Sequence, residues 1–234
     1  MDVGTLVLLH SPFVRASTWG ELPAALRQRG YDVVVVDVDD DDNPPYAARY
    51  VARSAQQITA AAPRAPVALI GHSAAGPLLP QVGYAQRAAR RQVGAYVFLD
   101  SRLPRTGASR LDLMHAADDT AAHAVHDELA RGGLAPVWND DDLAEIGLDQ
   151  AERTLVLAAA RPRGLAFFEE VLPYPGDWPD APCGYLQTSP GYESSARAAR
   201  LSGFRVETAE GGHFAVLTMP STVADTLVDL VMAL

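Results

Sequence analysis

The strongest constraint on the fold is an alternation of short apolar runs with longer, alanine-rich amphipathic segments. The runs are four or five residues long and rich in branched side chains, as strands buried on both faces of a sheet are. They lie at residues 5–9, 33–36, 67–70, 95–99, 184–187 and 204–207. Repeated strand–helix–strand units favour a parallel sheet, so this order predicts an α/β fold with helices on both faces of a mostly parallel sheet.

Helical spacing fills the intervals between these runs. Leu22, Ala25 and Leu26 fall on one face of a helix expected over residues 19–29, which Gly30 ends. We expect further helices at residues 46–62, after Gly76, near residues 193–201 and at residues 221–234, the last capped by Ser221.

The alternation stops between residues 101 and 182. This block has helical stretches at residues 119–131 and 141–160 and a proline-rich return to the next strand. It is too long for a simple crossover, and ligands of such sheets bind beyond the carboxyl ends of the strands. We therefore expect residues 1–100 and 183–234 to form the core, with residues 101–182 inserted as a helical cap after the strand that ends at Asp100.

Charge and composition exclude several function classes. The chain has 19 arginines, no lysine and 29 acidic residues, a net charge of 19 − 29 = −10. An acidic chain argues against nucleic-acid and anionic-membrane partners. The absence of lysine excludes Schiff-base, pyridoxal-phosphate and Walker-type phosphate chemistry, which need an amine. Cys183 is the single cysteine, so neither an internal disulfide nor a thiolate metal site is expected.

The remaining sequence indicates a cytoplasmic location. Residues 1–4 carry an aspartate where an export signal has basic residues. No apolar stretch approaches the roughly 20 residues that a membrane span needs.

The sequence Gly71-His72-Ser73-Ala74-Ala75 lies directly between a buried run and a helical segment. A serine at a tight strand-to-helix turn projects its hydroxyl above the sheet, and such a turn needs small residues two places before and after the serine. Gly71 and Ala75 meet this requirement, and Gly76 follows. The pattern taken alone is typical both of a nucleophilic serine at Ser73 and of a glycine-rich turn after a strand, and the motifs below favour the nucleophile.

A second motif, Gly211-Gly212-His213-Phe214, follows the last strand. A general base for Ser73 must come from a loop at the same edge of the sheet, and this loop satisfies that by topology. A third motif, residues 10–13, follows the first strand, where the second backbone donor of an oxyanion hole is expected. Pro12 has no N–H, so the donor there would be the Phe13 backbone, or the backbone or hydroxyl of Ser11.

Together these residues resemble a small member of the α/β-hydrolase superfamily over nearly the whole chain. The likeness is carried by residues 8–10 with Trp19, residues 71–76, Asp100 and residues 211–214. It implies a nucleophile at Ser73, a base at His213, oxyanion donors from the Ala74 backbone and the loop after His10, and no cofactor.

The acid of the triad has two candidates. It commonly follows the strand after the cap, but the loop at residues 188–193 contains only Glu193, which can also simply begin the next helix. Asp100 ends the strand after the nucleophile helix, where some members of the superfamily place the acid. From there it can hold the tautomer of His213, so Asp100 is preferred and Glu193 is the alternative.

Other polar clusters have simpler interpretations. We interpret the acidic run at residues 39–42 as a solvated loop rather than a calcium site. His115, His123 and His126, near Asp118 and Asp119, are interpreted as a solvated helical face, and no metal is expected. Four aromatic residues of the cap either pack its core or line a substrate pocket: Trp138, Phe167, Phe168 and Trp178.

The sequence thus predicts a serine hydrolase for a carboxylic ester or thioester, or an amide, of a small molecule. One alternative is an enzyme of the same fold that catalyses a reaction without net hydrolysis: a cyclase, lyase or acyltransferase of specialised metabolism. The other is a non-catalytic member that only binds a ligand. A small-molecule substrate is the expected partner, and the chain is expected to be a monomer or a homodimer.

Overall fold

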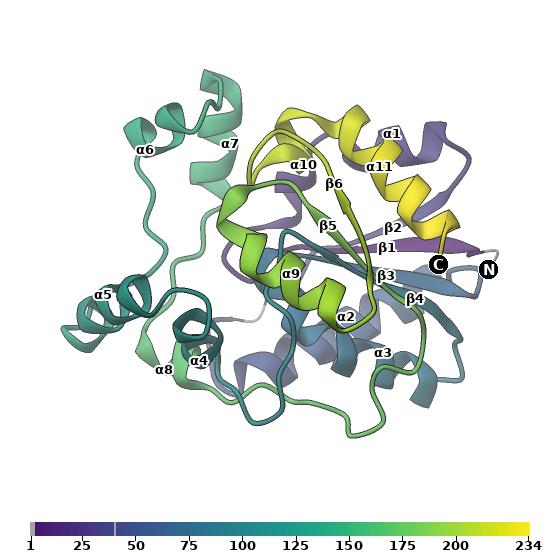
Figure 1. The fold of residues 1–234 in the computed structure, drawn as a ribbon, viewed down its shortest axis with the longest axis horizontal. Coiled ribbons are helices and arrows are strands. Elements are labelled where there is room, and N and C mark those ends of the chain that lie inside the picture. The colour runs from purple at the N-terminus through teal and green to yellow at the C-terminus, as the bar shows by residue number, and fades with distance from the viewer. Residues whose placement is uncertain (1–2, 40) are drawn as a thin grey trace.

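The computed structural model describes residues 3–39 and 41–234. Its centre is a six-stranded sheet in the order β2-β1-β3-β4-β5-β6, with every neighbouring pair parallel (Figure 1). The strands are β1 (Thr5–Leu9), β2 (Asp32–Val36), β3 (Val67–His72), β4 (Val93–Leu99), β5 (Cys183–Gln187) and β6 (Arg205–Thr208). The predicted parallel α/β fold is confirmed.

Helices cover both faces of the sheet, because alternate strand residues point to opposite sides. Leu6 and Leu8 of β1 pack with α1 (Leu22–Gln28) and α11 (Pro220–Met232). The other face packs against α2 (Tyr46–Ala61), α3 (Leu79–Ala88) and α9 (Glu193–Leu201). Each fully buried leucine or valine stabilises this arrangement by roughly 1.5–3 kcal/mol.

The strand order places a crevice between β1 and β3. From β1 the chain moves outward to β2, and from β3 it moves the opposite way to β4. The loops that follow β1 and β3 therefore diverge at the carboxyl edge of the sheet, which is where parallel sheets bind ligands. The motif at residues 10–13 and Ser73 lie on these two loops.

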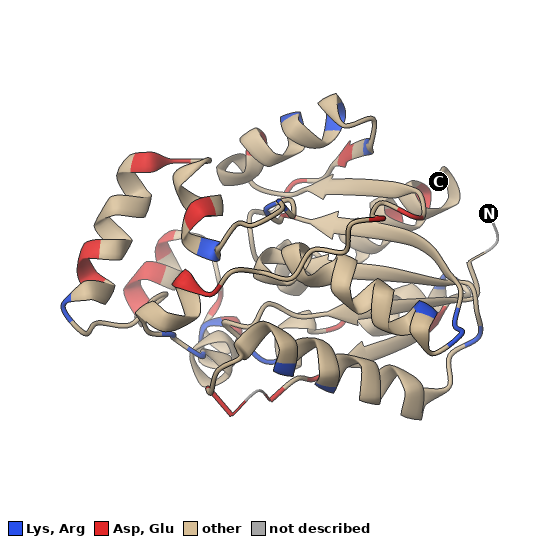
Figure 2. Ribbon diagram, turned by 90° about the horizontal axis from the view of Figure 1, so that it is seen from below, with Lys and Arg blue, Asp and Glu red and all other residues tan. Residues whose placement is uncertain are grey.

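Residues 101–182 connect β4 to β5. Their helices are α4 (Arg110–His115), α5 (Asp119–Ala130), α6 (Asp140–Glu145), α7 (Gln150–Ala159) and α8 (Leu165–Glu169). Figure 1 shows the helices α4 to α8 at the end of the sheet away from the N-terminus, while the chain after α8 runs back to the start of β5; Figure 2 shows many acidic residues on these helices. Because β1 begins near the N-terminus and the strands are parallel, this is their carboxyl end.

Several helix boundaries differ from the sequence expectations. The helix expected over residues 141–160 is two helices, since Gly147 adopts a φ of +89° between α6 and α7. The C-terminal helix begins at Pro220, so Ser221 lies inside its first turn and is not the cap. The short helix α4 was not expected; Ser109 and Asp112 form a capping box at its start. Among the described residues, no helix has both the length and the apolar composition needed to cross a membrane.

Candidate active site

Ser73 lies on a sharply turned backbone at the end of β3. Its φ is +56°, and it begins the 3-10 helix η2 (Ser73–Leu78). A non-glycine residue in this region is strained by roughly 1–3 kcal/mol, so the surroundings must impose the conformation. They do so by close packing: a Cβ at Gly71 would lie 2.9 Å from Cγ of Leu79, and a Cβ at Gly76 would overlap the Ser101 hydroxyl. Ser101 also donates a hydrogen bond to the Ser73 carbonyl at 2.6 Å.

His213 reaches Ser73 from the loop after β6. Gly211 and Gly212 have φ values of +121° and +76°, which lets the chain double back before the histidine. Nε2 of His213 lies 3.0 Å from Oγ of Ser73, and Nδ1 lies 2.8 Å from Oδ2 of Asp100. An ionised carboxylate only accepts hydrogen bonds, so Nδ1 carries the proton and the Nε2 lone pair faces the serine hydroxyl.

Asp100 is fully buried at the end of β4. Its Oδ1 accepts hydrogen bonds from the backbone N–H groups of Thr188 and Ser189, both at 3.0 Å. Its Oδ2 accepts from the Ser189 hydroxyl at 2.5 Å and from His213. Burial alone would raise the pKa of this carboxyl, but the bonds and charge of His213, together with the Ser189 and Thr188 bonds, hold that pKa below its usual value.

The alternative acid lies elsewhere. Glu193 is exposed at the start of α9, where its Oε1 lies 3.6 Å from Arg200. The structure therefore brings Asp100, and not Glu193, against His213.

Two aromatic rings enclose the imidazole of His213. The His72 ring stacks on it at a centroid distance of 4.8 Å, and the Tyr192 ring at 5.1 Å with an interplanar angle of 10°. Burial and the neighbouring His213 lower the pKa of His72 to about 3, so His72 is neutral and its Nε2 donates to the His213 carbonyl at 3.0 Å. Sequence reasoning missed Tyr192; the only signal was its position in the loop after β5.

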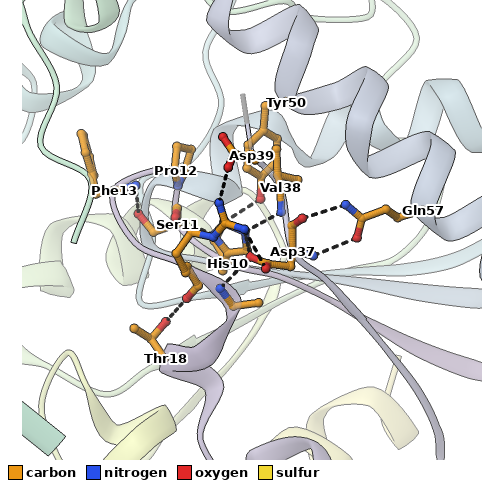
Figure 3. A network of polar contacts seen from close by, with 12 residues as sticks. His10, Ser11, Pro12, Phe13, Thr18, Asp37, Val38, Asp39, Tyr50 and Gln57 are labelled. Atoms are coloured by element: carbon orange, nitrogen blue, oxygen red, sulfur yellow. Dashed lines mark hydrogen bonds and ion pairs between the residues drawn. The ribbon is translucent and has the colours of Figure 1, made fainter. Parts of the chain in front are cut away.

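The loop after β1 is held by buried hydrogen bonds (Figure 3). The Val38 N–H donates to Nε2 of His10 at 2.9 Å, so Nδ1 carries the proton and donates to the Ser11 carbonyl at 2.8 Å. Burial lowers the pKa of His10, which favours this neutral form. The Tyr50 hydroxyl donates to the His10 carbonyl at 2.6 Å. His10 is thus an anchor of the loop.

Residues 161–163 hold the next two peptides of this loop. The Pro12 carbonyl accepts hydrogen bonds from Nε and one terminal nitrogen of Arg163, at 3.2 and 2.8 Å. The Phe13 carbonyl accepts from the Arg161 N–H at 2.7 Å. Because C=O and N–H point in opposite directions across a trans peptide, the Phe13 N–H turns away from Arg163. It donates to Oγ of Ser11 at 3.3 Å. Sequence reasoning missed Arg163.

Ser73 opens into an apolar cavity of about 360 Å³. The predicted donors Ser11, Phe13 and Ala74 line it. Other lining residues come from several elements: Val14, His72, Pro77, Arg102, Arg110, Leu113, Met114, Val125, Ala135, Pro136, Trp138, Phe168, Tyr192, His213 and Phe214.

Two of the four predicted pocket aromatics lie elsewhere. Trp138 and Phe168 line the cavity. Phe167 is buried behind it, against Phe13 and the Arg110 guanidinium. Trp178 packs on Phe98 in the core under α9. The pocket expectation for Phe167 and Trp178 is therefore corrected: both are packing residues.

The remaining clusters pair with neighbouring charges. In the acidic run, Asp39 pairs with Arg15, Asp41 with Arg53 and Asp42 with Arg163, while Asp40 lies outside the described residues. On α4 and α5, Nδ1 of His115 lies 2.8 Å from Asp119, which is also 3.5 Å from His123; His126 faces Asp127, and Asp118 caps α5.

The sequence matches the alpha/beta hydrolase family over residues 6–226. Similar solved structures include an extracellular alpha/beta-hydrolase from a Paenibacillus species, with a TM-score of 0.77 and 20% identity over 97% of this chain and 98% of that one. Tomato methylketone synthase I, complexed with 2-tridecanone, has a TM-score of 0.69 and 18% identity over 100% and 99%. A pyrethroid hydrolase from Sphingobium faniae has a TM-score of 0.69 and 17% identity over 99% and 98%. No curated protein sequence matches the chain. At these identities the structures show a shared fold.

Proposed function

Since the chain belongs to the alpha/beta hydrolase family, we propose that it is a serine hydrolase that cleaves a carboxylic ester or thioester of a small molecule. The observation that carries this proposal is the unbroken hydrogen-bond chain from Oγ of Ser73 through His213 to Asp100. A general base must lie within hydrogen-bond reach of the proton that it removes, and this geometry meets that condition.

In the first step, Nε2 of His213 takes the Ser73 proton while Oγ attacks the substrate carbonyl. The resulting imidazolium is stabilised by the buried Asp100 carboxylate. His213 then gives its proton to the departing alcohol or thiol, and the acyl group remains on Ser73. In the second step, His213 takes a proton from a water molecule, whose oxygen attacks the acyl carbonyl; the bond to Oγ of Ser73 then breaks as His213 returns the proton to Oγ, and the acid is released.

The tetrahedral intermediates carry a negative oxygen that needs donors. The Ala74 N–H directly follows the nucleophile, and the Phe13 N–H is turned away from Arg163 toward the Ser11 hydroxyl. When an oxyanion forms, the Phe13 N–H can exchange its long 3.3 Å bond to Ser11 for a shorter, charge-assisted one. One such donor contributes roughly 3 kcal/mol to the transition state.

The helices α4 to α8 act in this proposal as a cap. Leu113 and Met114 of α4 and Val125 of α5 line the cavity above Ser73. Their apolar side chains favour an ester with apolar substituents and keep bulk water away from the acyl-enzyme.

Labelling with a fluorophosphonate probe tests the proposal. The probe should modify wild-type protein at Ser73, as peptide mass spectrometry would show, and should not modify Ser73→Ala. The control is Ser202→Ala, because Ser202 is an exposed serine outside the cavity lining. Labelling at another residue, or none in the wild type, would contradict a serine nucleophile.

A second candidate is a reaction on the same scaffold without net hydrolysis. Pro12 has no N–H to donate, and the Phe13 N–H is engaged by Ser11, which weakens stabilisation of an oxyanion in the resting site. A similar structure, methylketone synthase I, is named for a product rather than for ester cleavage. Nitrophenyl esters separate the two: a hydrolase releases nitrophenol with turnover, whereas a non-hydrolytic enzyme leaves these esters intact.

A further inference from the structure

The charged side chains that line the cavity are positive, although the chain as a whole has a net negative charge. The sequence has 29 acidic residues against 19 arginines, yet among the described residues that line the cavity there are two arginines and no aspartate or glutamate. Both histidines of the lining, His72 and His213, belong to the triad region already described. The cavity wall therefore offers positive charge beside apolar side chains, with Arg110 buried and Arg102 partly exposed.

One of the two arginines has its charge matched within the protein. Arg110 is buried and donates to the Phe167 carbonyl at 3.0 Å, and it lies 3.6 Å from the carboxylate of Glu170. Its guanidinium also lies 3.8 Å from the Phe167 ring centroid. These contacts fix Arg110 as part of the wall.

The charge of Arg102 has no such match. The Arg102 guanidinium makes long hydrogen bonds to the hydroxyls of Ser194 and Ser195, at 3.4 and 3.5 Å, and its central carbon lies 4.8 Å from the Tyr192 ring centroid. In the part of the chain that the structure describes, no carboxylate lies within ion-pair distance of it. A guanidinium in this setting binds a carboxylate well, because its N–H groups match two carboxylate oxygens and it is weakly hydrated.

Tyr192 contacts both the Arg102 guanidinium and the proposed catalytic base. The tyrosine ring contacts Arg102 and also stacks on the imidazole of His213. An anion at Arg102 is therefore separated from the His213 imidazole by the Tyr192 ring, and it is distinct from the carbonyl that Ser73 attacks.

From these observations we infer that the substrate carries a free carboxylate, bound by Arg102, in addition to the ester or thioester that reacts at Ser73. The inference rests on the proposed function. The substrate class is an amphiphilic monoanion: an apolar body that fills the cavity, with the scissile group near one end and the carboxylate near the other. Monoesters of aliphatic dicarboxylic acids have this form.

Binding to the Ser73→Ala protein tests the inference without turnover. Isothermal titration compares monomethyl suberate, which has one ester and one carboxylate, with dimethyl suberate, which has two esters and no charge. We expect the monoanion to bind about 10- to 100-fold more tightly, as one charge-assisted contact allows.

Two further variants in the same background assign the effect. Arg102→Met should reduce the affinity for monomethyl suberate to that for dimethyl suberate and leave the latter unchanged, and Arg102→Lys should retain part of the preference. The matched control is Arg105→Met, which removes the same charge from an exposed position in the same loop and should change neither affinity.

Several outcomes would overturn the inference. They are equal affinity for the two esters, binding of neither, equal weakening of both by Arg102→Met, or the same loss from Arg105→Met. Because binding alone is measured, a protein that fails to hydrolyse esters still gives a decisive result on the carboxylate, and labelling of Ser73 judges the hydrolase proposal separately.

Discussion

Replacing Asp100 by asparagine should abolish most of the activity while leaving the site in place. The two backbone N–H groups of Thr188 and Ser189 both point at Oδ1, so an asparagine must put its oxygen there to satisfy them. Its NH₂ group then occupies the place of Oδ2, facing His213. An amide N–H facing Nδ1 favours the tautomer with the proton on Nε2, which can no longer accept the proton of Ser73.

The expected loss follows from this wrong tautomer. It is on the order of 10⁴-fold in kcat, or about 5.5 kcal/mol of transition-state stabilisation, while KM changes little. Initial rates with a 4-nitrophenyl ester give kcat, and urea denaturation establishes that the variant is folded.

Ser189→Ala is the matched control for this experiment. It removes one hydrogen bond from Oδ2 but leaves the carboxylate charge and the bond to His213. We expect a loss of about tenfold or less, the effect of one hydrogen bond to a charged group. If Asp100→Asn keeps more than a tenth of wild-type kcat, Asp100 does not set the tautomer of His213 and the argument from its hydrogen bonds is wrong.

Arg163→Met releases the Pro12 carbonyl, and we expect kcat to fall about 10- to 100-fold with KM nearly unchanged, as steady-state kinetics would show. A comparable rise in KM would argue against a role in the oxyanion donor. His72 has a folded-state pKa of about 3 against 6.5 unfolded, so stability falls as pH drops, by about 2 kcal/mol between pH 6.5 and 5. His72→Gln should reduce that loss in urea melts at the two pH values; an unchanged slope would contradict it. Gly76→Ala forces a methyl group onto Ser101 and should lower stability by about 1–3 kcal/mol, while Gly176→Ala, which meets open space, should not.

The sheet could be predicted because its determinants are local. Each strand is a short apolar run, and the alternation with helices specifies parallel neighbours without knowledge of any contact. Ser73 and His213 were predictable for a related reason, since parallel strands bring the loops at their carboxyl ends to one edge. The order of the motifs along the chain therefore already implies that the two side chains lie on the same side of the sheet.

The position of Asp100 at the end of a strand favoured it over Glu193 in the sequence, but no local pattern contains the contacts that decide between them. Asp100 is selected by hydrogen bonds from Thr188 and Ser189, which lie 88 and 89 residues away. Tyr192 stacks on His213 for the same kind of reason, because their loops meet only in the folded chain. The aromatic residues of the cap show most clearly what a sequence pattern cannot predict. Phe167 and Phe168 are adjacent in sequence, yet only Phe168 lines the cavity.

Helix ends in residues 101–182 were the least predictable part. The helices there are short, and their starts are decided by single side chains such as Ser109 and Asn139, each of which forms a capping box. Periodicity over a long window averages across such breaks, which is why the interruption at Gly147 was not expected.

The hydrogen bonds from Arg163 to the Pro12 carbonyl make the position of the oxyanion donor depend on a part of the chain outside the sheet. Ser73, His213 and Asp100 lie at the end of strands or on the loops that follow them. The peptide that presents the Phe13 N–H is instead held by hydrogen bonds from residues 161–163, in the segment between α7 and α8. A change that displaced this segment would tilt the peptide that presents the Phe13 N–H and leave Ser73, His213 and Asp100 in place. The oxyanion donor and the Ser73–His213–Asp100 triad are therefore held by different parts of the chain, so a substitution in this segment can lower the rate of reaction without contacting any of the three residues.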